Sequence, residues 1–285
     1  MNRSPDPRSR SRSNHGFSLV ELLVVIAIIA VLIALLFVSV SNLQASARLT
    51  QCMSNQHQLQ VGLVSFSQDN NGKFMSPAST YFPPGIANPN RDLFWVKSYN
   101  QGAAADGLRL VDNSVGQGEE TEWAIRDGAL YDYVGDVKAY SSPLDTTGRI
   151  RTYALNGFIS DIPDNPNQAW GPCVDRISKI RDPSNTLYTI AEFDEGWEDN
   201  FNRGGWVVDI PQRVWKDTPA FFDPRSRLAM SFVDGSSRIV DLKNPELQDA
   251  AVDPSNLGRE VRVSEDEQAM GYDFEQFAEW LDPTR

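Results

Sequence analysis

The sequence predicts an α+β fold, in which a long N-terminal helix packs on a globular domain built around an antiparallel sheet. The first observation is that no proline occurs between Phe17 and Pro77, so this stretch can form one continuous helix. The second is that short apolar runs alternate with Gly, Pro, Asn and Asp beyond Pro77, which is typical of a loop-rich antiparallel sheet. A chain of 285 residues with 41% hydrophobic side chains is large enough for a substantial core.

Residues 1–16 form a basic segment rich in Arg, Ser and Pro, which we interpret as a cleaved leader and not as part of the fold. The whole chain carries a formal charge of -12, and removal of the basic leader makes the remainder more acidic still. An acidic surface offers no basic stripe to a phosphate backbone. We therefore expect no nucleic-acid partner.

Residues 17–38 are predicted to form a transmembrane helix. They contain one charged side chain, Glu21, and as a helix they extend over about 33 Å, close to the thickness of a bilayer's hydrocarbon core. A carboxylate in a membrane costs at least about 2.5 kcal/mol, so Glu21 is expected to have a partner. Since basic residues precede the helix and an acidic chain follows it, we expect a single-pass protein of the inner (cytoplasmic) membrane. Its N-terminus would be cytoplasmic and its C-terminal domain periplasmic or extracellular, with the lipid bilayer as a partner.

Residues 39–71 are predicted to continue this helix as an amphipathic stalk. Apolar residues recur there at spacings of three and four, which indicates one face packed on the domain. The helix is expected to end at Asp69, because Asn70, Asn71 and Gly72 tolerate the left-handed conformation of helix ends. The predicted buried stripe consists of Leu49, Met53, Leu59, Leu63 and Phe66.

Residues 72–285 are predicted to form the extracytoplasmic α+β domain. Asp234 and Gly235 lie between two apolar runs and favour a tight hairpin turn. A closing helix is expected over Asp273–Leu281, where aromatic and aliphatic residues share one face. The predicted strands are Leu93–Tyr99, Ile150–Ile159, Thr186–Phe193, Trp206–Ile210, Arg227–Val233 and Ser237–Leu242.

An ordinary secretory signal peptide is the main alternative for the N-terminus. It also places a basic segment before an apolar one, and Ala45-Ser46-Ala47 matches its cleavage pattern. However, the apolar run is longer than the roughly 7–15 residues of a signal core, and it contains Glu21 four positions after a phenylalanine that follows Gly16. These features favour cleavage at Gly16 and a retained helix.

The stretch GFSLVELLVVIAIIAVL resembles the N-terminal motif of type IV pilins and of the pseudopilins of type II secretion systems. The resemblance implies that a prepilin peptidase cleaves after Gly16 and methylates the new N-terminus at Phe17. It also implies that Glu21 acts in assembly, by neutralising an amine between neighbouring subunits in an apolar environment. Other pilin or pseudopilin subunits and an inner-membrane secretion platform are then partners, and the outer domain is expected to be pilin-like.

The outer domain resembles a pseudopilin-like family of planctomycete-type bacteria whose domain ends in an H-x9-DG motif. The segments that carry this resemblance lie within 128–145, 151–158, 182–195 and 228–242. The chain departs from the family at two positions, since Ser142 stands where a cysteine is common and Pro224 where the histidine would be. A site that depends on that histidine is absent, and Asp234-Gly235 is better interpreted as a turn than as a ligand site.

Candidate residues for other chemistry are few. Glu192, Asp194 and Glu195 lie in an acidic run whose oxygen atoms suit Ca²⁺, but the spacing differs from an EF-hand and a solvated loop is the competing interpretation. No cofactor is predicted, with Ca²⁺ as the alternative. Cys52 and Cys173 are either two free thiols or a pair formed in an oxidising compartment.

The seven tryptophans favour a packed core, because aromatic side chains bury large areas. The alternative is an exposed aromatic surface for glycans or secreted partners. Trp197 and Trp215 lie in polar stretches of the sequence and are the candidates for that surface.

The sequence therefore predicts a structural subunit and no enzyme. The expected function is assembly through the N-terminal helix into a type II secretion pseudopilus or a type IV-like filament. The alternative is a monomeric membrane-anchored protein that binds glycans or secreted substrates outside the cytoplasm. A secreted hydrolase behind a signal peptide is a third interpretation, which predicts a mature N-terminus near residue 48.

Overall fold

A computed structural model of the chain describes residues 18–77, 94–96, 122–146, 150–160, 166–193, 205–223, 225–243, 247, 261–263 and 268–285. Contacts divide the chain into two units, Met1–Gln44 and Ala45–Arg285. Helix α1 (Leu19–Asp69) contributes residues to both units.

Helix α1 ends where the sequence predicts. Asn71 has φ 56° and Gly72 has φ 78°, so the chain turns through the left-handed region directly after Asp69. The Gly72 N–H donates a hydrogen bond of 2.7 Å to the carbonyl of Ser67, five residues back. This bond is the mark of a Schellman motif, which satisfies a carbonyl at the helix end. The predicted helix end is therefore confirmed.

The predicted membrane span over residues 17–38 is not found among the described helices. None of them combines the length and the hydropathy that crossing a membrane requires. The span, and the predicted domain boundaries at residues 16, 38 and 71, stay predictions.

The shorter helices lie in the unit Ala45–Arg285. Gly62 is the one glycine of α1, and a Cβ there would lie 2.7 Å from Val134 and 2.9 Å from Leu130. Gly62 thus allows α1 and α3 to approach closely. The helices are α2 (Glu122–Arg126), α3 (Tyr131–Val134) and α5 (Gln268–Leu281), and the 3₁₀ turns are Val137–Tyr140, Pro166–Ala169 and Ile177–Lys179.

The main sheet is five-stranded and antiparallel, with β1-β2-β6-β7 in order and β5 beside β2. A second sheet has the order β3-β4-β8. The antiparallel α+β prediction is therefore confirmed. The strands are β1 (Tyr153–Leu155), β2 (Leu187–Phe193), β3 (Val208–Asp209), β4 (Val214–Trp215), β5 (Thr218–Pro219), β6 (Arg227–Phe232), β7 (Ser237–Asp241) and β8 (Val261–Arg262).

Five of the six predicted strands overlap observed strands, each of which is shorter than predicted. The prediction over Leu93–Tyr99 is described only at residues 94–96, where Phe94 forms an isolated bridge with Ser76. The predicted hairpin joins β6 to β7, and Gly235 has φ 94° in its turn. Strands β4, β5 and β8 were not predicted, because segments of two residues carry too little alternation to detect.

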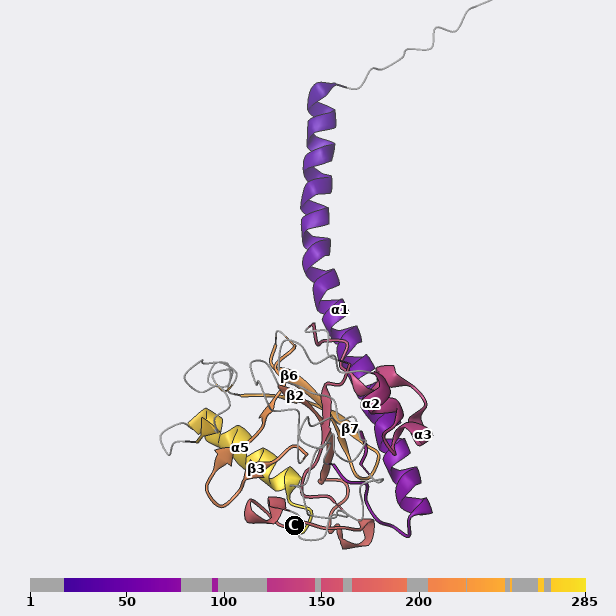
Figure 1. The fold of residues 1–285 in the computed structure, drawn as a ribbon. Helices are drawn as coiled ribbons and strands as arrows, with labels where there is room; N and C mark the ends of the chain where they lie inside the picture. Colours follow the sequence, from indigo (N-terminus) through magenta and orange to yellow (C-terminus); the bar gives the residue numbers. More distant parts are fainter. Residues whose placement is uncertain are drawn as a thin grey trace, which may run out of the picture. The chain divides into compact units, whose positions relative to one another are not determined.

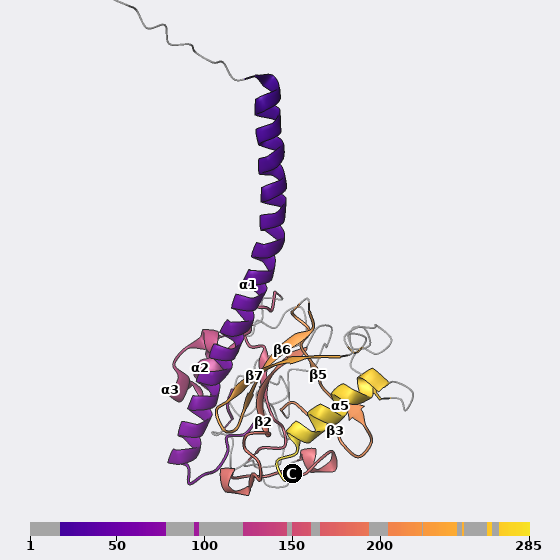
Figure 2. The same cartoon turned by 180° about the vertical axis from the view of Figure 1, so that it is seen from behind.

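Helices cover both faces of the main sheet. In opposite views, β2, β6 and β7 lie between the second half of α1 and helix α5 (Figure 1 and Figure 2). Side chains of β6 alternate accordingly: Ala229 packs with Leu49 and Cys52 of α1, whereas Phe232 contacts Trp280 of α5 with ring centroids 5.9 Å apart.

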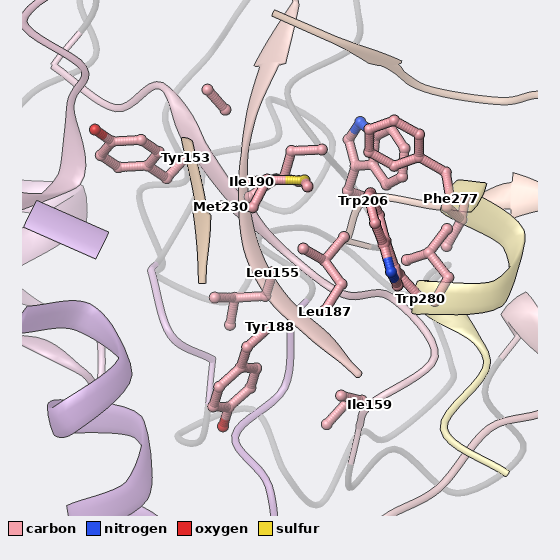
Figure 3. Close-up of a cluster of buried hydrophobic side chains, with 14 of the residues drawn as sticks. Tyr153, Leu155, Ile159, Leu187, Tyr188, Ile190, Trp206, Met230, Phe277 and Trp280 are labelled. Atoms are coloured by element: carbon pink, nitrogen blue, oxygen red, sulfur yellow. The ribbon is translucent and has the colours of Figure 1, made fainter. Parts of the chain in front are cut away.

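The core beneath α5 is aromatic. Trp206, Phe277 and Trp280 lie together beside Leu187 (Figure 3), with centroid distances of 5.4 Å from Phe277 to each tryptophan. Trp215 joins this cluster and is only 1% exposed. The prediction of core tryptophans is thus confirmed for these residues, and the suggestion that Trp215 forms an exposed binding surface is wrong. Trp197 lies outside the described residues.

Candidate processing and assembly site

Helix α1 begins with a capping box formed by Ser18 and Glu21. The backbone N–H of Ser18 donates to Glu21 Oε2 at 2.8 Å, and the N–H of Glu21 donates to Ser18 Oγ at 3.1 Å. Two N–H groups that have no partner within the helix are satisfied in this way. The Glu21 carboxylate is therefore held at the first turn, where the partial positive charge of the helix N-terminus also favours it.

The first half of α1 is otherwise an apolar surface. Every residue from Ser18 to Leu35 is exposed, and Glu21 is the one charged side chain among them. Leu19 is 82% exposed and Leu35 is 65% exposed. Contiguous exposed apolar surface of this kind indicates an interaction site. Gly16 and Phe17, the predicted cleavage and methylation sites, lie outside the described residues.

The acidic run after β2 gives no metal site within the described part of the chain. Glu192 is a buried residue of β2, 5% exposed, and its N–H donates to the carbonyl of Thr152 in the sheet. Asp194 and Glu195 lie outside the described residues. Among the residues that the structure covers, no three His, Cys, Asp or Glu side chains come together in a way that would hold a metal ion.

The two cysteines are free thiols. Cys52 is buried, and its Sγ lies 3.1 Å from the Oγ of Ser142. Burial raises the pKa of the Cys52 thiol and, to about 12, that of Cys173, so both stay protonated at neutral pH. Cys52 and Ser142 thus join α1 to the domain by a polar contact.

The described contacts of the turn after β6 are those of a structural turn. The Oδ1 of Asp234 accepts a hydrogen bond of 2.9 Å from the N–H of Ser236, and the N–H of Gly235 donates to the carbonyl of Phe232. These bonds are those of an Asx-stabilised hairpin turn. Pro224, the position where the resemblance would place a histidine, lies outside the described residues.

Polar residues on the buried face of α1 were missed by the sequence analysis. Asn55, Gln56 and Gln60 are 6%, 0% and 4% exposed, although amides are mostly found at protein surfaces. The available signal was their spacing, because these residues interrupt the apolar stripe on the face that it defines.

A comparison with known families finds one match in the N-terminal region. Residues 11–37 match the family described as the prokaryotic N-terminal methylation motif. No curated protein and no solved structure matches the chain. The match includes the capping box of Ser18 and Glu21, together with the predicted cleavage and methylation residues. The chain therefore carries the prokaryotic N-terminal methylation motif at residues 11–37, consistent with a prepilin-type cleavage/methylation protein.

Proposed function

We propose that the protein is a structural, non-enzymatic subunit of the pilin and pseudopilin type, assembled through the first half of α1. The proposal rests on the methylation motif at residues 11–37. The second part of this motif is an exposed apolar helix, and the first turn of that helix carries a single carboxylate. The anchor would be the inner membrane, and the assembly a type II secretion pseudopilus or a type IV-like filament. The domain formed from residue 45 onward would lie outside the cytoplasm.

The capping box suggests how processing and assembly are connected. Cleavage after Gly16 would leave an ammonium group on Phe17, directly before the N–H of Ser18 that now donates to Glu21. An ammonium is a stronger donor to a carboxylate than a neutral amide. In an apolar environment, each of the two charges needs a partner of opposite sign. The Glu21 carboxylate is held where it would pair with such an amine, on its own chain or on a neighbouring copy.

The processing step is tested by the mass and N-terminal sequence of the mature protein. We expect a chain that begins with methylated Phe17, because a prepilin peptidase would cut after Gly16. A mature N-terminus near residue 48 would show that the segment is an ordinary signal peptide and would refute the proposal. A Gly16→Leu variant serves as the control and should keep the leader.

The assembly step is tested by two substitutions of Glu21. Glu21→Gln removes the charge but keeps a side chain that can complete a capping box. Glu21→Leu removes both. We expect both variants to lose intermolecular cross-links between copies in the membrane at least tenfold, since each leaves the new amine without its carboxylate.

The same pair of variants separates assembly from simple anchoring. An anchored monomeric binding protein would keep its function in Glu21→Leu and would be held in the membrane at least as firmly, because the substitution removes a charge from an apolar helix. Unchanged cross-linking in both variants would contradict an assembly role for Glu21.

A further inference from the structure

The second half of α1 buries three amide side chains against the domain. Asn55, Gln56 and Gln60 are almost completely buried on a helix face that is otherwise apolar. A buried amide is tolerated only where its polar atoms find hydrogen-bond partners. The partners of these side chains are therefore specific contacts between α1 and the sheet.

Gln56 uses both ends of its amide. Its Nε2 donates to the carbonyl of Ala229 in β6 at 2.6 Å, which fixes the orientation of the amide because a carbonyl oxygen only accepts. Its Oε1 then accepts from Thr189 Oγ1 of β2 at 2.8 Å. Since the Thr189 proton is used in that bond, the contact of 2.5 Å with Ser231 has the Ser231 hydroxyl as its donor.

The carbonyl of Ala229 is open to Gln56 because the β2–β6 ladder ends there. Thr189 pairs with Ser231, and the next hydrogen-bonded pair of an antiparallel ladder would be Ala191 with Ala229. The Ala191 carbonyl instead accepts from the N–H of Ala220, where β5 takes the place of β6 beside β2. The Gln56 side chain thus replaces a strand at the open corner of the sheet.

Gln60 and Asn55 repeat this arrangement on either side of Gln56. Gln60 Nε2 donates to the carbonyl of Val233 at 3.2 Å, where β6 enters its turn. A Cβ on Gly235 in that turn would lie 3.6 Å from the Gln60 amide. Asn55 Nδ2 donates to the carbonyls of Lys138 at 3.2 Å and Ser141 at 2.9 Å. The helix is therefore bonded to backbone at three levels.

The apolar contacts of the same face would be kept only in part if α1 moved along the sheet. A slide of one turn would bring Leu59 into the place of Leu63, which keeps an apolar contact, but it would also bring Gly62 into the place of Phe66, which loses one. The same slide would put Cys52 in the place of Gln56. Gln56 would at the same time take the place of Gln60, so the Ala229 carbonyl is the acceptor that would lose its amide donor.

We propose that Gln56 and Gln60 are positioning residues that fix the register of helix α1 on the sheet. Buried polar side chains have this role where several apolar registers compete. The inference stands independently of filament assembly, because it concerns contacts within one chain. Under the proposed function, it means that the part of α1 from Ala45 onward and the outer domain move as one body.

A disulfide reports the register directly. Cys52 Sγ lies 3.1 Å from Ser142 Oγ, so Ser142→Cys, combined with Cys173→Ser, should form an intramolecular disulfide in the full-length protein under mild oxidation. Gln56→Met with Gln60→Met should lower the rate of this cross-link at least tenfold, because unbranched side chains of similar length fill the space without the hydrogen bonds. Gln58→Met, at an exposed position of the same helix, is the matched control and should leave the rate unchanged.

A second reporter detects the displaced helix. Arg48→Cys, with Cys52→Ser and Ser142→Cys, should cross-link only when α1 slides by one turn, so its yield should rise in the double methionine variant. The proposal would be overturned if the double methionine variant formed the Ser142→Cys cross-link at a rate within twofold of the control and formed no Arg48→Cys cross-link. If the double variant does not fold, Gln60→Met alone decides, with an intermediate rate in support and an unchanged rate against. In the Glu21 variants, loss of cross-links between copies with an unchanged rate of the intramolecular cross-link would concern assembly and not the register of α1.

Discussion

The two halves of helix α1 have the same backbone conformation and opposite surroundings. From Leu19 to Leu35, apolar side chains are exposed in every direction, and Glu21 is the single charge. In the second half, Leu59 is 0% and Leu63 is 1% exposed, whereas Val61, which lies between them in the sequence, is 49% exposed. The second half therefore finds its partner within its own chain.

This difference shows how one helix can serve two purposes. The second half has the amphipathic pattern of a helix on a globular core, with amides at defined positions. The first half has no such pattern, and a helix that is apolar on all sides is expected in a membrane or in a bundle of apolar helices. Under the proposed function, its partners would be lipids and other copies.

The largest expected effect comes from replacing one leucine in each half of α1 by alanine. Leu63→Ala should lower the free energy of unfolding of the domain by about 2–5 kcal/mol, because it leaves a cavity in the main core. Leu23→Ala, at a position 57% exposed, should change it by less than about 0.5 kcal/mol. Urea unfolding followed by tryptophan fluorescence measures both, since several tryptophans are buried in the same core. Equal losses would show that the first half also packs on the domain.

The next effect concerns a buried ion pair beside the beginning of the packed half. The Asp223 carboxylate is fully buried and bonds Arg227 Nη2 at 2.9 Å, while the neighbouring Arg225 reaches Ser46 of α1 at 3.2 Å. Asp223→Asn should lower the free energy of unfolding by about 1.5–3 kcal/mol at neutral pH, because Arg227 loses its charged partner. Asp175→Asn, at a half-exposed ion pair, is the control and should cost less than about 1 kcal/mol.

This ion pair also predicts how stability depends on pH. Burial by itself would raise the pKa of Asp223, but the hydrogen bonds from Arg227 and from the Arg225 N–H outweigh it and hold the pKa below the ordinary value of 3.8. A lowered folded pKa means that the contribution is complete above the unfolded pKa and is lost as pH falls through the folded one. Urea midpoints measured from pH 5 downward should therefore fall less steeply in Asp223→Asn than in the natural protein. Parallel curves would contradict this assignment.

The sequence predicted those parts of the fold that depend on local chemistry. Asn71 and Gly72 ended α1 as predicted, and Asp234-Gly235 formed the hairpin, because both signals act through the conformations that these residues tolerate. The stripe of α1 was predicted because periodicity determines which side chains share a face. At the N-terminus, the motif around Glu21 was recognisable because its residues are contiguous in sequence.

The rest depends on contacts between distant segments, which a single sequence does not show. Trp215 was kept as a candidate for the alternative of an exposed surface, because its two-residue strand β4 is buried by α5 and its neighbours, which are distant in sequence. Gln56 was overlooked because its partners, Thr189 and Ala229, lie more than 130 residues away, with separations of 133 and 173. The open corner of the sheet that makes Gln56 necessary is a property of strand pairing, and no local pattern encodes it.

The smallest expected effect tests the start of the exposed half. Ser18→Ala removes the hydroxyl that accepts the Glu21 N–H, at a cost of about 1 kcal/mol confined to the first turn of α1. Amide exchange at Glu21 should therefore become about fivefold faster, with no change in the urea midpoint of the domain. Ser18→Thr keeps the accepting oxygen and should restore slow exchange, and Ser54→Ala, at an exposed position in the packed half, should have no effect. If exchange at Glu21 were equally slow in Ser18→Ala, its N–H would be protected by contacts other than the capping box, and the first half of α1 would be less independent of its surroundings than its exposure indicates.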